Sequence, residues 1–330
     1  IYTEYGLPRR LLQPHDVIVT KAGEVWYSSF GEQVIGKLNP VDGTVREFQV
    51  DVSKPDYPLG ILAIREDREG KLWIGNMYQA AIAEFDPKSE KFTYYRPAPK
   101  DNLPSTQLNQ VAPYNRQVDG KVWTQNSGFA GVHRFDLKTG QVETWAPFKD
   151  SKKQHNIYDV ISDSKNNVFF TDSRQQEIGR IDAKTGEIKL FDTDEKDSGP
   201  RRGMVDAQDR VWTALNRTDS VTMFDPKTQK FKSWATGIPE YYAYDVWADR
   251  HGEAWASTEF ADRVVRIEGE PALDPDGLVR RVHCVVRDLT DDASPSPELI
   301  LGAYTTIAFH DWLKKRYGDL PSITIAWGWT

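Results

Sequence analysis

The sequence is poor in the features that mark several familiar classes of protein. It contains a single cysteine, Cys284, which excludes an intrachain disulfide and a zinc site built from cysteines. No window approaches the roughly 18 consecutive apolar residues of a membrane-spanning helix. The net charge of −7 argues against nucleic acid as a general partner. A Walker-type phosphate loop, a Gly-x-Ser-x-Gly elbow and a dinucleotide-binding fingerprint are also missing from the sequence.

Aromatic residues, by contrast, are abundant and regularly spaced. Five tryptophans and one phenylalanine each lie three positions after a turn residue, at successive spacings of 47, 50, 46, 43 and 43 residues. The series is Trp26, Trp73, Trp123, Phe169, Trp212 and Trp255. Such a period is that of one β-propeller blade, typically about 40 to 50 residues. Large rings fill the widening gap between wedge-shaped blades, so we assign these residues a structural role between blades.

Each repeat carries the same succession of short strands and tight turns. In the first repeat an apolar run at 17–19 precedes Gly23, and an alternating strand at 25–27 follows it. In the fourth repeat a strand at 178–181 leads through a turn at 182–186 into a further strand at 188–191. Glycine supplies the positive φ that ends such a turn. Four antiparallel strands per repeat is the propeller unit.

We therefore expect an all-β fold, a single seven-bladed β-propeller domain of four-stranded antiparallel blades. The predicted blades lie near 14–50, 58–97, 107–147, 156–193, 201–236, 242–267, and 278–312 together with 1–7, followed by an irregular tail at 313–330. The last blade would take its first three strands from 279–286, 299–303 and 306–309, and its fourth from 2–5. This pairing would close the ring and remove two exposed sheet edges. Six blades with an appendage is the alternative, because residues 268–330 are irregular.

The repeat resembles that of a known family. The motifs that carry the resemblance are Pro14-His15-Asp16-Val17, Gly23-Glu24-Val25-Trp26, Glu177-Ile178-Gly179-Arg180-Ile181-Asp182 and the Lys-Thr-Gly turns. Over roughly residues 1–267 they are similar to the virginiamycin B lyase (streptogramin lyase) family of seven-bladed propellers. The resemblance implies a carbon–oxygen lyase, in which a magnesium ion, two histidines and nearby glutamates open an ester-linked ring.

The resemblance also implies candidate catalytic residues. The family histidines stand just before the first strand of the last two blades, where this sequence has Tyr244 and Arg280. His15 keeps the Pro-His motif, but in the first blade. Glu259, four residues after Trp255, resembles the catalytic glutamate of the family, although it lies one blade early. His15, Tyr244 and Glu259 are therefore the acid–base candidates.

The repeat register places one residue pair per blade at the same mouth of the central channel. The pairs are His15-Asp16, Leu59-Gly60, Asn109-Gln110, Tyr158-Asp159, Arg201-Arg202, Tyr244-Asp245 and Arg280-Arg281. Arginine forks suit carboxylate or phosphate. We therefore expect the four arginines of these pairs, with Tyr158, to bind a small, anionic molecule. The alternative is that arginine and aspartate of different blades pair with each other and lock the ring.

A divalent metal is a second expectation for the mouth. Asp16, Asp159 and Asp245 recur there, and carboxylate oxygens suit Mg²⁺ or Ca²⁺. Arginine on the alternate blades would repel such a cation.

Three functions fit a propeller of this kind, because the fold alone does not choose among them. They are a metal-assisted carbon–oxygen lyase, a non-catalytic propeller that binds an anionic small molecule or a peptide, and a lactonase-like metal hydrolase. We expect a monomer with a small-molecule ligand, no nucleic acid and no membrane span. The sequence begins at Ile1 rather than Met, which a removed signal peptide or trimming would explain. A periplasmic or secreted location is the expectation.

Overall fold

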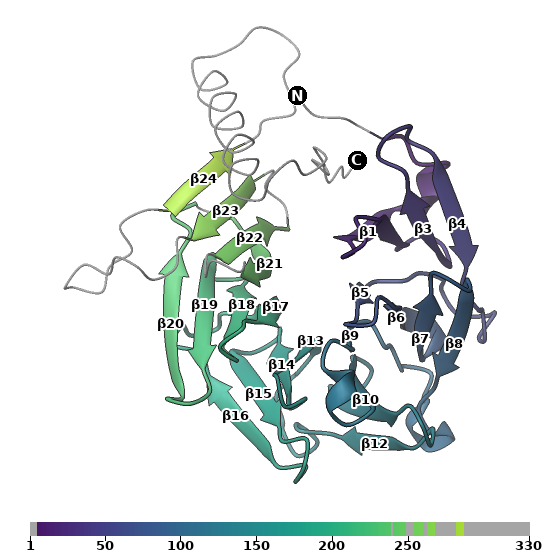
Figure 1. Cartoon of the computed structure of the whole chain (residues 1–330). Helices are drawn as coiled ribbons and strands as arrows, with labels where there is room; N and C mark the ends of the chain where they lie inside the picture. Colours follow the sequence, from purple (N-terminus) through teal and green to yellow (C-terminus); the bar gives the residue numbers. More distant parts are fainter. Residues whose placement is uncertain (1–4, 239, 249–253, 260–262, 268–281, 287–330) are drawn as a thin grey trace, which may run out of the picture.

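The turn-and-aromatic segments form the second strands of six four-stranded antiparallel sheets, which are arranged as blades around a central axis (Figure 1). This computed structural model describes residues 5–238, 240–248, 254–259, 263–267 and 282–286. Among these residues, no helix has the length and apolar character that crossing a membrane requires.

The strands follow one another in sequence order within every blade. The first three blades contain β1 (Pro14–Val19), β2 (Val25–Ser29), β3 (Val34–Leu38) and β4 (Val45–Gln49); β5 (Ile64–Glu66), β6 (Leu72–Asn76), β7 (Ala81–Asp86) and β8 (Lys91–Tyr95); and β9 (Val111–Ala112), β10 (Lys121–Asn126), β11 (Gly131–Asp136) and β12 (Val142–Trp145). The other three contain β13 (Ile157–Ser162), β14 (Val168–Asp172), β15 (Glu177–Ile181) and β16 (Ile188–Asp192); β17 (Pro200–Val205), β18 (Val211–Leu215), β19 (Ser220–Asp225) and β20 (Lys230–Ala235); and β21 (Ala243–Ala248), β22 (Ala254–Thr258), β23 (Arg263–Ile267) and β24 (Val282–Val286). Short 3-10 helices are η1 (Arg10–Leu12), η2 (Met77–Gln79), η3 (Pro99–Asp101) and η4 (Arg116–Val118).

The first strand of each blade lies nearest the axis, and the fourth lies at the rim (Figure 1). Residues at the start of β1, β13, β17 and β21 therefore gather at one end of the channel, which is where the predicted pairs fall.

Third-strand glycines have a packing role that explains the Ile-Gly-Lys/Arg motif. Gly36 pairs across the sheet with Tyr27, and Gly179 with Phe170. A Cβ added to Gly36 would lie 2.1 Å from the Tyr27 ring, and one added to Gly179 would lie 1.9 Å from the Phe170 ring. Only glycine leaves the second-strand ring room to cover the neighbouring strand.

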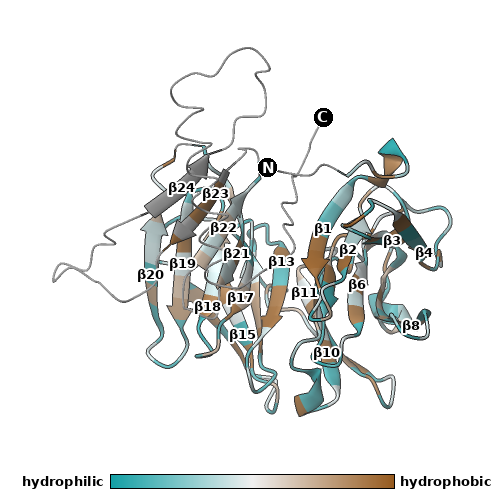
Figure 2. Ribbon diagram, turned by 45° about the horizontal axis from the view of Figure 1, so that its top comes forward, coloured by the Kyte–Doolittle hydropathy of each residue, from teal (hydrophilic) through white to brown (hydrophobic). Residues whose placement is uncertain are grey.

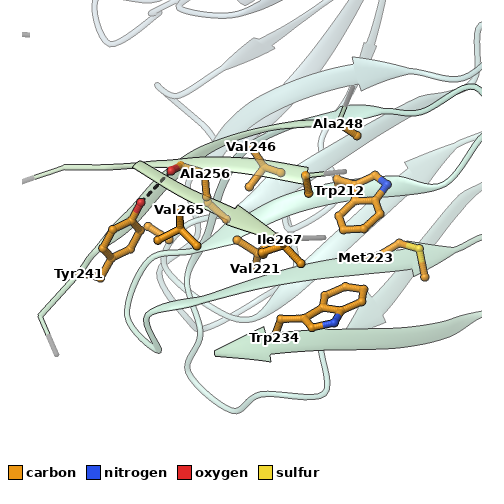
Figure 3. Packing of buried hydrophobic residues seen from close by; sticks show 13 residues of the cluster. Trp212, Val221, Met223, Trp234, Tyr241, Val246, Ala248, Ala256, Val265 and Ile267 are labelled. Atoms are coloured by element: carbon orange, nitrogen blue, oxygen red, sulfur yellow. Dashed lines mark hydrogen bonds between the residues drawn. The ribbon is translucent and has the colours of Figure 1, made fainter. Parts of the chain in front are cut away.

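Five apolar clusters fill the five interfaces between successive described blades. Each contains one repeat aromatic packed against the following blade, as expected for Trp26, Trp73, Trp123, Phe169 and Trp212, which are all buried. Figure 3 shows the cluster between the fifth and sixth blades, where the rings of Trp212 and Trp234 stack at 5.3 Å. Trp255, the sixth of the series, is only half-buried. Apolar stretches along β1 and β13 stand out from the hydrophilic loops near β8 in Figure 2.

The described residues contain six blades, not the seven expected. Strand β24 was predicted to begin a seventh blade, but it pairs with β23 in register Arg263↔Val286 to Ile267↔Val282 and is the outer strand of the sixth. The assignment of β24 to a seventh blade was wrong because 14 residues, 268–281, separate β23 from β24. The corresponding strands β15 and β16 are separated by only 6 residues, 182–187. The strands predicted at 299–303 and 306–309, residues 2–4 of the strand predicted at 2–5, and the tail at 313–330 lie outside the described residues.

Candidate functional site

A β-bulge marks the innermost strand of four blades at the predicted residue pair. In β1, Pro14 pairs with Ser29 and Val17 with Tyr27, so two residues, His15 and Asp16, oppose one residue of β2. The same shift occurs at Tyr158-Asp159 in β13 and Arg201-Arg202 in β17, and a register shift marks Tyr244 in β21. A bulge breaks the regular alternation of side chains. Adjacent residues of these strands can therefore both reach toward the axis.

A buried ion pair joins the fifth blade to the first. Arg202 donates from Nη1 and Nη2 to the two carboxylate oxygens of Asp16, at 2.7 and 2.6 Å, and both side chains are buried. Burial opposes ionisation of Asp16, but the Arg202 guanidinium and the hydrogen bond from His15 outweigh it and hold the pKa of Asp16 well below its usual range. Such a two-pronged pair fixes the relative position of the blades that carry it.

Asp245 is a weaker partner of the same arginine. Its Oδ2 lies 3.5 Å from Arg202 Nη1, and 35% of its side chain is exposed. Burial raises the pKa of Asp245, and the charge of Arg202 only partly offsets this effect. The carboxyl group of Asp245 is thus easier to protonate than that of Asp16.

A second ion pair, between half-buried Arg65 and buried Asp159, connects the second, third, fourth and fifth blades. Arg65 donates from Nη2 to Asp159 Oδ1 at 2.9 Å and to Gln110 Oε1 at 3.2 Å. The other oxygen of Asp159 accepts the backbone N–H of Gly203 at 3.1 Å. Arg65 was missed by sequence reasoning. A signal was present, because the residue opposite the repeat aromatic is apolar in the other described blades (for example Ile18 and Ile161), and Arg65 alone is charged there.

Nearer the opening, three side chains form a hydrogen-bonded row. Tyr158 and Tyr244 hydroxyls lie 2.8 Å apart, and the Tyr244 hydroxyl lies 3.2 Å from His15 Nε2. His15 Nδ1 lies 2.8 Å from Asp16, whose ionised carboxylate can only accept, so Nδ1 carries a proton and Nε2 faces Tyr244. Burial, reinforced by Tyr158, raises the pKa of Tyr244 well above its usual range. The row can therefore store and pass a proton.

Arg201 and Glu259 complete the row at the opening. Arg201 Nη1 donates to Glu259 Oε1 at 3.0 Å and lies 3.5 Å from the Tyr158 hydroxyl. Its guanidinium carbon lies 4.9 Å from the centroid of the Tyr158 ring and 5.6 Å from that of Tyr244. Asn216 donates to the other carboxylate oxygen of Glu259 at 3.1 Å. The register thus brings all three acid–base candidates and Tyr158 together with Arg201.

The three guanidinium groups of the described mouth are matched by four carboxyl groups, those of Asp16, Asp159, Asp245 and Glu259. Arg65, Arg201 and Arg202 each contact a carboxylate, as the ring-locking alternative requires. The excess of guanidinium over carboxylate that an anion site would need is not found among the described mouth residues. Arg280 and Arg281, which would supply it, lie outside the described residues.

The aspartates proposed as metal ligands do not suit a divalent cation. Both oxygens of Asp16 face Arg202, and Asp159 accepts from Arg65 and from the backbone. Asp245 also faces Arg202. A cation there would meet guanidinium groups at contact distance, so we derive no step through a metal.

The chain matches a known protein family. The model of the SMP-30/gluconolactonase/LRE-like region matches residues 16–244. The chain belongs to this family. No curated protein sequence matches the chain.

Solved structures show the same fold. Streptogramin B lyase has a TM-score of 0.70 at 18% identity, covering 89% of each chain. Virginiamycin B lyase from Staphylococcus aureus has a TM-score of 0.69 at 17% identity, covering 86% of this chain and 87% of that one. The WD40 repeats of RRP9 reach a TM-score of 0.62 at 11% identity, covering 79% and 77%. The likeness to streptogramin lyases expected from the repeat motifs is confirmed for the fold.

Proposed function

We propose that the channel mouth is the active site of a carbon–oxygen lyase acting on a small cyclic ester or a related carboxyl compound. The observation that carries the proposal is the row His15–Tyr244–Tyr158, which ends beside the Arg201–Glu259 pair. The fold shared with streptogramin B lyase and virginiamycin B lyase supports the same reaction class.

Elimination needs three groups close together: one that holds the carbonyl, a base and an acid. Arg201 Nη1 stands between Glu259 and the Tyr158 hydroxyl, at 3.0 and 3.5 Å. Among the described residues, Nε and Nη2 of Arg201 have no hydrogen-bond partner and can hold the substrate's carbonyl or carboxylate oxygen. Glu259 takes the proton from the carbon next to that carbonyl, a carbon–carbon double bond forms, and the carbon–oxygen bond breaks. Tyr158 gives its proton to the departing oxygen and regains one through Tyr244 from His15, whose Nε2 first takes a proton from water. Glu259 returns its proton to water when the product leaves.

The test is the mass of the product formed from virginiamycin B, the compound that names one structural relative. Elimination opens the ring without changing the mass, whereas hydrolysis adds one water. We expect a product of unchanged mass, formed roughly 10²–10⁴-fold more slowly by the Tyr158→Phe variant because the acid is lost. Tyr114→Phe is the matched control, since Tyr114 is an exposed tyrosine outside the mouth.

Other outcomes would choose between the remaining functions. A product heavier by one water, from virginiamycin B or from simple lactones, would favour the lactonase-like hydrolase. Heat of binding in calorimetry without any product would favour a non-catalytic ligand-binding propeller. Equal rates for Tyr158→Phe and Tyr114→Phe would contradict the role given to the tyrosine row.

We also propose that a seventh blade stands between β21–β24 and β1–β4, built from residues outside the described ranges. Large apolar side chains on the two flanking blades support it: Trp247 is 64% exposed on β21, and Val19 is 51% exposed on β1. At the register position of Trp247, Ile161 of β13 is buried by a neighbouring blade. Exposed apolar surface of this kind usually has a partner.

Deleting residues 287–330 is expected to lower the melting temperature sharply, because it would uncover both flanking blades. Deletion of 313–330 alone is the control and should cost little, since that segment has no place in the repeat. Circular dichroism measured against temperature decides between them. Equal melting curves for the full chain and the longer deletion would rule out the seventh blade. A monomeric state and a periplasmic or secreted location stay predictions. Binding of Mg²⁺ or Ca²⁺ also stays untested, although Asp16, Asp159 and Asp245 do not suit such an ion.

A further inference from the structure

A second group of chemically active side chains lies in the fourth blade, outside the row of the channel mouth. His155 Nε2 lies 2.7 Å from Ser151 Oγ, and His155 Nδ1 lies 2.5 Å from Asp172 Oδ2. Ser151 belongs to the loop between β12 and β13, and Asp172 ends β14. His155 lies at a loop position, for which the sequence predicts a structural or solvated side chain.

The fourth blade departs here from its neighbours. Asn76 and Asn126 end β6 and β10, where Asp172 ends β14. Asn126 Oδ1 accepts the backbone N–H groups of Gly128 and Gln107, just as Asp172 Oδ1 accepts those of Arg174 and Asn156 at 3.0 Å. An asparagine would serve this structural role equally well. The second carboxylate oxygen of Asp172 has a separate use, the contact with His155.

The contacts prepare His155 to act as a base toward Ser151. Asp172 is fully buried, and an ionised carboxylate only accepts, so Nδ1 of His155 carries the proton. Nε2 is then left as the acceptor for the Ser151 hydroxyl. The Phe148 ring stacks on the imidazole at 3.9 Å and 2°, which holds its plane. This order of nucleophile, base and orienting carboxylate is that of serine hydrolases.

The nucleophile itself is open to solvent, while its base is nearly buried. The backbone N–H of Lys153 donates to Ser151 Oγ at 3.1 Å, which favours negative charge developing on that oxygen. The N–H of Lys152, the residue after the serine, has no acceptor among the described residues, and such an N–H contributes to the oxyanion site of many serine hydrolases.

We propose that Ser151, His155 and Asp172 form a second, hydrolytic site that accepts acyl groups from small carboxylic esters. Ser151 Oγ attacks the ester carbonyl carbon while its proton passes to His155 Nε2. The tetrahedral intermediate collapses, the carbon–oxygen bond to the alcohol breaks, and the alcohol leaves with the proton from His155. Water then attacks the acyl-serine, again through His155, and releases the carboxylic acid. The site does not depend on the lyase proposed for the channel mouth.

The test uses a fluorophosphonate probe, which reacts covalently with activated serines, followed by peptide mass mapping. We expect one label per chain, on Ser151, and none in the Ser151→Ala variant. His155→Gln and Asp172→Asn should slow labelling by roughly 10²–10⁴-fold, because the base or its orientation is lost. Asp172→Asn should keep the melting temperature, since asparagine occupies the equivalent place in two other blades.

The control is Ser164→Ala, because Ser164 is another exposed serine, bound to Asp209 and not to a histidine. Its labelling should equal that of the unchanged protein. Full labelling of His155→Gln, or no labelling at Ser151 in the unchanged protein, would overturn the proposal.

A different outcome would assign the cluster to a metal, since ligand atoms of His155, Asp172 and Glu177 lie within 4.8 Å of one another. A metal site would be shown by one Zn²⁺ bound per chain that is lost in the Glu177→Gln variant. If Ser151 also stayed unlabelled after the metal was removed by a chelator, the hydrolytic site would be overturned.

Discussion

Replacing Arg202 with alanine is expected to lower the free energy of unfolding by about 3–5 kcal/mol at neutral pH. The change removes both hydrogen bonds to Asp16 and leaves that carboxylate buried without a cation. An uncompensated buried charge costs far more than the net value of the pair that neutralised it. Urea denaturation followed by tryptophan fluorescence would measure the loss.

The pH dependence gives this prediction a second, independent readout. Arg202 holds the folded-state pKa of Asp16 below its unfolded value, so the pair stabilises the fold above about pH 4 and loses this effect as pH falls toward the lower folded value. Without Arg202, burial favours the protonated carboxyl. The deficit of Arg202→Ala should therefore shrink on acidification, and Asp16→Asn added to this variant should recover part of the loss at neutral pH.

Arg46→Ala is the matched control, because Arg46 and Glu90 form an exposed ion pair. Exposed pairs contribute about 0–1 kcal/mol, so this variant should differ little from the unchanged protein. A loss for Arg202→Ala no larger than that of the control, or one that stays constant with pH, would show that the buried pair does not lock the ring.

The repeat explains why much of the fold was predictable. The aromatics recur at nearly constant spacing, so one register places Trp26 and Trp212 between blades and His15 and Arg201 at the mouth. Periodicity carries no information where the period is broken. Because 14 residues separate β23 from β24, the repeat did not predict β24 as the outer strand of the sixth blade.

The choice of partners at the mouth was beyond sequence reasoning. Asp16 and Arg202 are 186 residues apart, and no local pattern says which aspartate an arginine will meet across an axis. Nor does the pattern reveal that Arg65 reaches the fourth blade to neutralise Asp159. The positions of the charges were therefore predictable, whereas their mutual neutralisation became visible only with the blades in place.

The second large effect is expected for Trp73→Ala, which should cost about 3–5 kcal/mol of unfolding free energy. Trp73 is fully buried in the cluster between the second and third blades, where it stacks on Tyr95 at a centroid distance of 5.8 Å. Its Nε1 donates to Asp67 Oδ2 at 2.9 Å, and Arg116 donates to the same oxygen at 2.7 Å. The truncation therefore opens a cavity and also removes one hydrogen bond from a buried carboxylate. Urea denaturation monitored by circular dichroism would measure the cost.

Two further variants separate these causes. Trp73→Phe keeps most of the ring and loses the N–H, so it should cost roughly 1–2 kcal/mol, the value of one hydrogen bond to a carboxylate that Arg116 still contacts. Val41→Ala truncates a side chain that is 91% exposed and should stay within about 0.5 kcal/mol. If Trp73→Ala were no more damaging than Val41→Ala, the aromatic would not fill the gap between the blades. If Trp73→Phe matched Trp73→Ala, the hydrogen bond to Asp67, not the volume of the ring, would hold the second and third blades together.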